Sequence, residues 1–93
     1  MAVPKSLDWE KIKRGFIIQM DDGRYVSSIL ANGNPEKPVV YFTEYAWEAK
    51  AWKSIRGVII ARNRIRETVG GCKAMGFAYD EVLRARCIGQ EVD

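Results

Sequence analysis

The sequence predicts an α+β domain in which one main helix covers an antiparallel sheet of three or four strands. Two runs rich in β-branched and aromatic residues flank an Asp-Gly turn, which is typical of a β-hairpin. Residues 54–69 repeat apolar side chains at offsets of three and four, which indicates a helix. Residues 83–87 alternate apolar and basic side chains, which favours a strand. A chain of 93 residues with this composition is expected to form a single domain, 1–93.

The N-terminal third is predicted to contain a short helix and the hairpin. The helix follows Ser6 and ends at Gly15, with an extended lead-in as the alternative. The hairpin covers 15–30, and a two-residue type I′ turn at Asp22-Gly23 would pair residues whose numbers sum to 45. The pairs would be Asp21 with Arg24, Met20 with Tyr25, Ile18 with Ser27 and Phe16 with Ile29. Five residues would then share the core face of the sheet: Phe16, Ile18, Met20, Tyr25 and Ile29.

The middle of the chain is predicted to form a loop over 31–38 and a third strand over 38–43, with Pro38 at its first position. Residues 45–52 are expected to form a helical turn followed by a short extended piece. The main helix follows, with Ser54 as N-cap and Gly70-Gly71 as the stop. Its apolar stripe consists of Val58, Ala61, Ile65 and Val69.

The C-terminal part is predicted to contain a connector over 72–80 and a final strand. In that strand Leu83, Ala85 and Cys87 would face the core, and Arg84 and Arg86 would face outward. A terminal helix from Asp80 is the alternative.

Positive charge is concentrated in one part of the chain. Between residues 50 and 73 there are seven basic residues and one acid, whereas the remaining residues carry a net negative charge. On a helix at about 100° per residue, Arg62 and Arg66 form one ridge, Arg64 lies nearly opposite, and Arg56 lies about 120° from Arg62. This ridge is interpreted as a protein-binding surface, as a contact to the DNA or RNA backbone, or as an ordinary solvated helix face.

The partner-binding hypothesis combines this helix with nearby aromatic side chains. Tyr45 and Trp47 lie just before the basic segment, and aromatic and arginine side chains are the usual anchors of protein interfaces. The same aromatic residues could stack on single-stranded nucleic acid or could belong to the core. The complete candidate surface is Lys53, Arg56, Arg62, Arg66, Tyr45 and Trp47, with Arg84 and Arg86 as a secondary basic patch.

No group of residues predicts catalysis, a metal site or a cofactor. The chain has no histidine, and the carboxylate pairs at Glu44/Glu48 and Asp21/Asp22 lack a neighbouring nucleophile or metal ligand. Cys72 and Cys87 are expected to be free thiols, with a single bridge between them as the alternative. Neither a membrane span nor a secretory signal is recognisable, so the expected location is the cytoplasm of a bacterial host.

The order of the segments resembles that of small accessory proteins of phages and prophages with a loose YVS…YFT…AK.W.S pattern. The matching residues are YVSSI at 25–29 and VVYFTEYAWEAKAWKS at 39–54. The resemblance implies a compact cytoplasmic domain of an infected bacterium, and some such proteins inhibit host defence, as anti-CRISPR proteins do. We therefore expect a non-enzymatic binding module that occludes or modulates a host protein or nucleoprotein, for example a defence nuclease such as a CRISPR effector. The alternative is a small basic regulator that binds nucleic acid.

Overall fold

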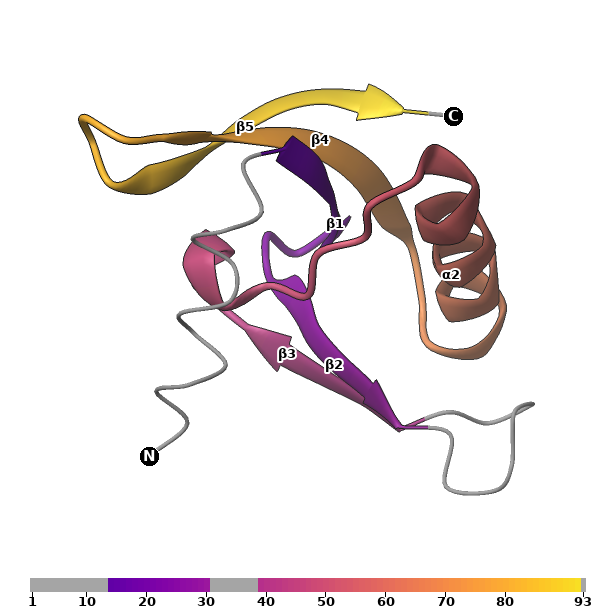
Figure 1. Ribbon diagram of the computed structural model, residues 1–93. Coiled ribbons are helices and arrows are strands. Elements are labelled where there is room, and N and C mark those ends of the chain that lie inside the picture. Colours follow the sequence, from indigo (N-terminus) through magenta and orange to yellow (C-terminus); the bar gives the residue numbers. More distant parts are fainter. Residues whose placement is uncertain (1–13, 31–38, 93) are drawn as a thin grey trace.

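The computed structural model describes residues 14–30 and 39–92, and it confirms the α+β fold class (Figure 1). The elements are β1 (Arg14–Met20), β2 (Tyr25–Leu30), β3 (Val39–Thr43), the 3-10 turn η1 (Ala46–Glu48), α2 (Ile55–Thr68), β4 (Cys72–Asp80) and β5 (Ala85–Val92). The predicted short helix and the predicted loop at 31–38 lie outside the described residues, except that Arg14 and Gly15 belong to β1.

The five strands form one antiparallel sheet in the order β3-β2-β1-β4-β5. The strand absent from the prediction is β4, because a connector was expected over 72–80, and that expectation is wrong. Its burial pattern does alternate at first, since Cys72 and Ala74 are buried and Lys73 is exposed. Farther along the strand, Met75 and Phe77 pack in the core on the opposite face, so β4 has apolar side chains on both sides and its sequence lacks the period-two pattern of a half-buried strand.

The β1–β2 hairpin has a register one residue away from the predicted one. Gln19, and not Met20, lies opposite Tyr25. Gly23 has a φ of 96°, and Asp22 is not among the described residues with positive φ. A type I′ turn needs positive φ at both central residues, so Asp22-Gly23 cannot form one. The loop instead contains three residues, 21–23, and the Met20 N–H donates to the Arg24 carbonyl at 2.6 Å.

The change of register alters which side chains share a face. Val26, and not Tyr25, lies in the core on the side of α2, together with Ile18 and Met20. Tyr25 packs on the opposite face beside Ile17, because a shift of one residue moves a side chain to the other face. The predicted position of Ile29 is nevertheless correct, since a bulge in β2 between Val26 and Ser28 restores its side chain to the α2 face.

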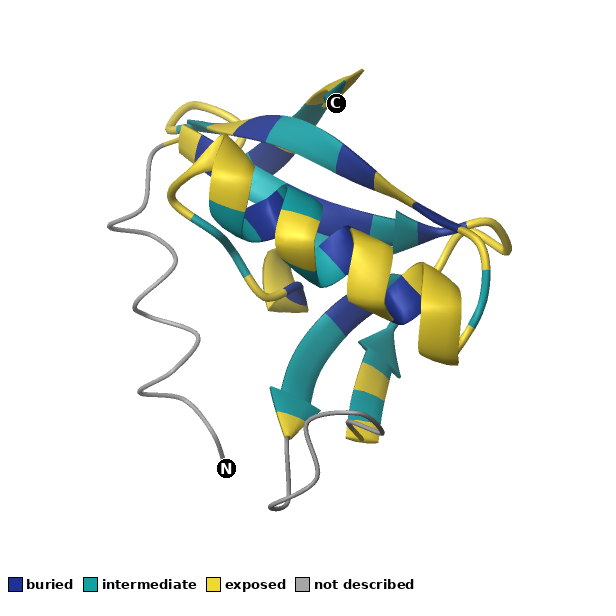
Figure 2. Cartoon of the chain, turned by 90° about the vertical axis from the view of Figure 1, so that its right-hand side faces the viewer, coloured by how far each residue is buried: buried dark blue, intermediate teal, exposed yellow. Residues whose placement is uncertain are grey.

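The sheet carries a small core on each face. On one face α2 packs against β1 and β4, with Val58 and Ile65 fully buried (Figure 2). On the other face Ile17 and Phe77 pack against Ala49, which directly follows η1. The chain between η1 and α2 has the predicted extended form, because Trp52 exchanges two backbone hydrogen bonds with Phe16, at 2.8 and 2.9 Å.

The C-terminal segment is the predicted strand and not the alternative helix, but its sides are reversed. Leu83 is 67% exposed and Cys87 is exposed, whereas Arg86 is only 7% exposed. The turn before β5 has Arg84 at a φ of 52°, so β5 begins only at Ala85. Leu83 and Arg84 therefore belong to the turn. Within β5 the buried side is taken by Arg86 instead of Cys87, because its guanidinium donates to the carbonyls of Ala46 and Ala49.

Candidate interaction surface

The main helix begins and ends as predicted. The Ser54 hydroxyl accepts a hydrogen bond from the Gly57 N–H at 3.1 Å, which satisfies one of the free donors of the first turn. The helix ends at Thr68, and the N–H groups of Val69 and Gly70 donate to the Ile65 carbonyl. The burial of Val58 and Ile65 against the sheet fixes the rotation of α2 about its axis and hence the residues that it exposes.

Both arginines of the ridge predicted from sequence are bonded to the sheet, and only one of them remains in solvent. Arg62 is 7% exposed, and its Nη1 donates to the Val92 carbonyl of β5 at 3.3 Å. Arg66 is exposed, but its Nε donates to the Cys72 carbonyl at the start of β4 at 3.0 Å. Both side chains tie the helix to the strands beside it. The buried side of α2 thus includes Arg62. It does not include Val69, which was predicted to belong to the apolar stripe but is 46% exposed.

The side of α2 that faces solvent carries five residues within an arc of about 100° at 100° per residue. We call this set the outer face; its members are Arg56, Ile60, Asn63, Arg64 and Glu67. Ile60 is 54% exposed at its centre, between the two arginines. Within the described part of the chain neither Arg56 nor Arg64 forms an ion pair. The outer face thus presents two cations around an apolar side chain, and Figure 2 shows this side of the helix exposed along its length.

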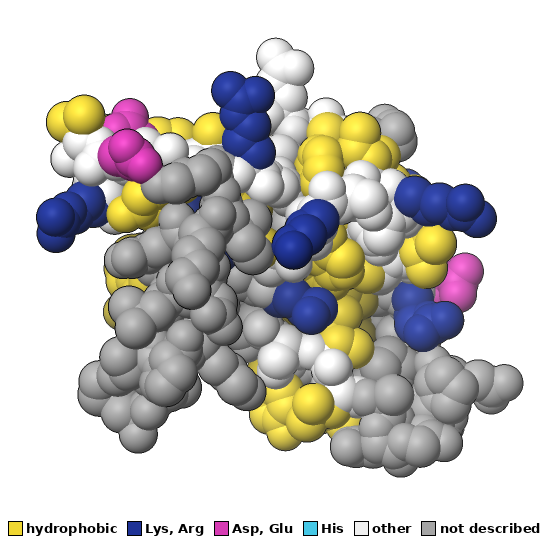
Figure 3. Space-filling view, in the orientation of Figure 1, with side chains coloured by type: hydrophobic (Ala, Val, Ile, Leu, Met, Phe, Trp, Pro, Cys, Tyr) yellow, Lys and Arg dark blue, Asp and Glu magenta, His cyan; other side chains and the backbone are white. Residues whose placement is uncertain are grey.

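Further cations lie on the segment that leads into the helix. Lys50 and Lys53 are exposed, and the Lys50 ammonium lies 5.5 Å from the centre of the Trp52 ring. Figure 3 shows basic side chains spread over this side of the molecule, while the acidic side chains that are visible lie toward its edges. An excess of positive charge on one side of a protein attracts acidic partners.

The two predicted aromatic anchors form an exposed stacked pair on the 3-10 turn. Tyr45 is 47% and Trp47 is 46% exposed, and their ring centres lie 4.5 Å apart with an angle of 26° between the planes. The turn is closed by the Glu48 N–H, which donates to the Tyr45 carbonyl at 3.1 Å. Both side chains are therefore exposed, as the choice of Tyr45 and Trp47 as candidate anchors requires.

Arg86 holds this turn from beneath. Its Nη1 donates to the carbonyls of Ala46 and Ala49, at 2.9 and 2.7 Å. The guanidinium also lies over the Phe77 ring, 4.6 Å from its centre. Burial lowers the pKa of Arg86 to about 10, which still leaves the side chain charged at neutral pH. Arg86 is therefore buried and stabilises the backbone of the turn, whereas Arg84 is exposed. The predicted secondary patch of Arg84 and Arg86 does not form on the surface.

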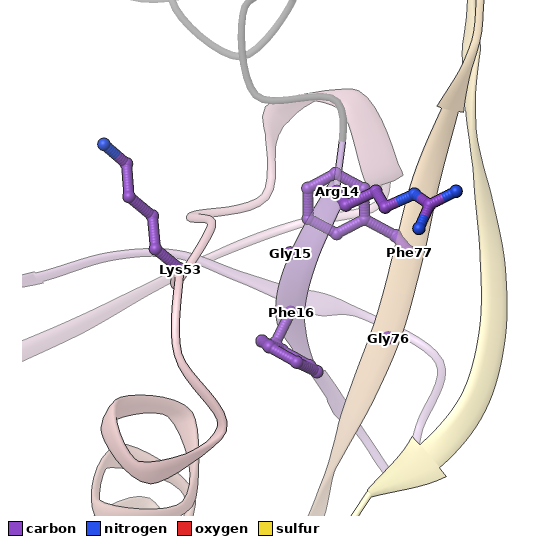
Figure 4. Close-up of a pocket in the computed structure, with 6 residues that line it drawn as sticks. All are labelled: Arg14, Gly15, Phe16, Lys53, Gly76 and Phe77. Atoms are coloured by element: carbon purple, nitrogen blue, oxygen red, sulfur yellow. The ribbon is translucent and has the colours of Figure 1, made fainter.

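A shallow groove of about 370 Å³ lies where β1 and β4 pair, next to the start of α2 (Figure 4). Its lining includes Phe16, Gly76 and Phe77, with Arg14 and Lys53 at its margin. In Figure 4 the ammonium of Lys53 and the guanidinium of Arg14 point in opposite directions, away from the space between them. A ligand pocket normally has a few polar groups that converge on one point, so this geometry does not favour a small-molecule site.

The two cysteines are free, as expected, and differ in exposure. Cys72 is buried, its thiol donates to the Arg62 carbonyl at 3.6 Å, and burial raises its pKa. Within residues 14–30 and 39–92 no cluster of carboxylates and thiols could hold a metal ion. In the same part of the chain no helix has the length and apolar content to cross a membrane.

No protein-family model matches this sequence, and no curated protein or solved structure is significantly similar to it. The resemblance to phage accessory proteins therefore stays a prediction.

Proposed function

We propose that the chain is a non-enzymatic binding module that holds an acidic surface of a host protein or nucleoprotein. The observation that carries the proposal is the outer face of α2, where Arg56 and Arg64 flank an exposed isoleucine and form no ion pair within the described residues. Isolated exposed cations are common, but an apolar centre between unpaired arginines is the arrangement expected at a protein interface.

A protein surface fits this arrangement better than bare nucleic acid. Burial of Ile60 against an apolar group would stabilise a complex, and Arg56 and Arg64 would meet carboxylates at the rim. Glu67 lies on the same face and would repel carboxylates and phosphates alike, so the preference for a protein rests on the apolar side chain of Ile60. On the resemblance to phage accessory proteins, a defence nuclease such as a CRISPR effector is the first target to test.

The second candidate is a regulator that binds nucleic acid. Arg56, Asn63 and Arg64 share the outer face, and these side-chain types contact bases in the major groove. The affinity of such a complex would fall steeply with salt, with a log–log slope of about −0.9 for each phosphate neutralised on duplex DNA.

Quantitative affinity capture from a bacterial lysate, with and without nuclease treatment, separates the two candidates. We expect the wild-type protein to retain one macromolecule stoichiometrically after nuclease treatment. The double variant Arg56→Glu/Arg64→Glu should lose it, because the reversed charges would face carboxylates. Retention that disappears with nuclease, together with direct binding to purified DNA or RNA, would favour the second candidate.

The matched control is Lys73→Glu/Arg84→Glu. It changes the net charge by the same amount at two exposed positions away from the outer face. Lys73 alternates with the buried residues Cys72 and Ala74, so its side chain lies on the side of the sheet opposite α2. If both double variants lose the partner equally, net charge and not the outer face governs binding, and the proposal fails.

A further inference from the structure

We infer that the aromatic turn is a separate contact site for a cationic side chain, an arginine or lysine of the bound partner. The site consists of the stacked rings of Tyr45 and Trp47 and the carboxylates of Glu44 and Glu48. The inference rests on the proposed function, because it describes a second contact made by the same partner.

The rings of Tyr45 and Trp47 are suited to bind a cation. The electron-rich face of a tyrosine or tryptophan ring attracts a cation. In this protein Phe42, Trp52 and Phe77 each have a basic side chain of the same chain over the ring. Among the described residues no basic side chain lies over Tyr45 or Trp47, although both rings are nearly half exposed. These two rings are therefore free to receive a cation from outside.

The carboxylates of Glu44 and Glu48 indicate that the ligand of this site is positively charged. Glu44 and Glu48 are both exposed and immediately flank the Tyr45–Trp47 segment, so this short turn is acidic although the next segment is basic. Glu48 is held in place, because the Thr43 hydroxyl donates to its Oε1 at 2.7 Å and accepts from the Tyr45 N–H at 3.1 Å. Its Oε2 has no hydrogen-bond partner among the described residues and can accept from a guanidinium or an ammonium.

The turn is also rigidly placed. Arg86 donates to the carbonyls on both sides of Trp47, those of Ala46 and Ala49, and is itself stacked on Phe77. A site whose backbone is fixed before binding loses less conformational entropy when a ligand arrives. The buried arginine is thus a positioning residue for the exposed aromatic pair.

The two sites have opposite charge preferences, and this has a consequence for the complex. The outer face of α2 requires acidic groups on the partner, and the aromatic turn requires a basic one. A partner that satisfies both can bind in one orientation only, which is how charge complementarity gives specificity.

The test uses a short peptide with one central arginine between glycines, blocked at both ends, and its citrulline counterpart, which has nearly the same shape without the charge. Binding is followed by the NMR signal of the Trp47 indole N–H, which is identified by its loss in Trp47→Phe. We expect a saturable shift with the arginine peptide. Trp47→Ala or Glu44→Gln/Glu48→Gln should weaken binding about three- to tenfold, measured for Trp47→Ala on the backbone amides of the turn.

Two controls separate this inference from the proposed function. Tyr41→Ala removes a tyrosine of similar exposure from β3 and should leave the affinity for the peptide unchanged. Arg56→Glu/Arg64→Glu should abolish capture of the lysate partner but should not weaken peptide binding. Equal binding of the citrulline peptide, or no effect of the Trp47 and glutamate variants, would overturn the cation site without affecting the outer face. Self-association that disappears in Trp47→Ala would also overturn it, because a second copy would then occupy the site.

Discussion

Replacement of the buried Arg86 by methionine should strongly destabilise the domain. The change removes two charged hydrogen bonds, to the carbonyls of Ala46 and Ala49, and the contact of the guanidinium with Phe77. Each such bond contributes about 1.5–3 kcal/mol, and part of this is offset because the variant no longer buries a charge. Methionine preserves most of the packing on the ring. We therefore expect a loss of about 2–4 kcal/mol in the free energy of unfolding.

For a domain of this size that loss corresponds to a fall of roughly 10–30 °C in Tm. Thermal and urea unfolding, followed by circular dichroism, measure it. The matched control is Arg84→Met, two residues earlier in the chain and exposed, which should change the stability by less than about 0.5 kcal/mol. If Arg86→Met and Arg84→Met have the same Tm, Arg86 does not clamp the turn and the reasoning is refuted.

Three further predictions concern local geometry. Gly15→Ala should lower the free energy of unfolding by about 1–3 kcal/mol, because its Cβ would lie 2.8 Å from the Trp52 carbonyl oxygen. Gly76→Ala should be neutral or slightly stabilising, because the nearest atom to its Cβ would be 3.8 Å away. Urea unfolding of both variants checks this, and equal stabilities would contradict it. Arg84→Gly should raise stability by about 0.5–1 kcal/mol, because Arg84 has a φ of 52°, and a fall in Tm would contradict this. A maleimide reagent should label Cys87 within minutes and Cys72 only in denaturant, as mass spectrometry can follow; equal rates in the native protein would show that Cys72 is not buried.

Much of the fold could be predicted from local patterns. The α2 helix was predictable because Ser54, the Val58–Ile65 spacing and Gly70-Gly71 all indicate the same boundaries. The register of the hairpin was not, since Asp-Gly is compatible with both a two-residue and a three-residue loop. The choice depends on which residue takes positive φ, and Gly23 alone does so in this turn.

The candidate site was only partly predictable. Tyr45 and Trp47 could be singled out as aromatic residues next to a basic segment, and both are exposed. The burial of Arg62 had a signal in the sequence, because it lies about 40° from Val58 on a helix and so belongs to the inward side. The same angular positions around the helix axis also predict which residues form the outer face. The burial of Arg86 had no local signal, since its partners at Ala46 and Ala49 are about 40 residues away in the chain.

The most direct test of the outer face is chemical modification of arginines, mapped by mass spectrometry in the free protein and in the presence of the captured partner. In the free protein we predict rapid modification of Arg56 and Arg64 and slow modification of Arg62, which is 7% exposed. In the complex Arg56 and Arg64 should become protected, while the exposed Arg84 should stay reactive. Rapid modification of Arg62 in the free protein, or unchanged reactivity of Arg56 and Arg64 in the complex, would contradict the assignment of this surface.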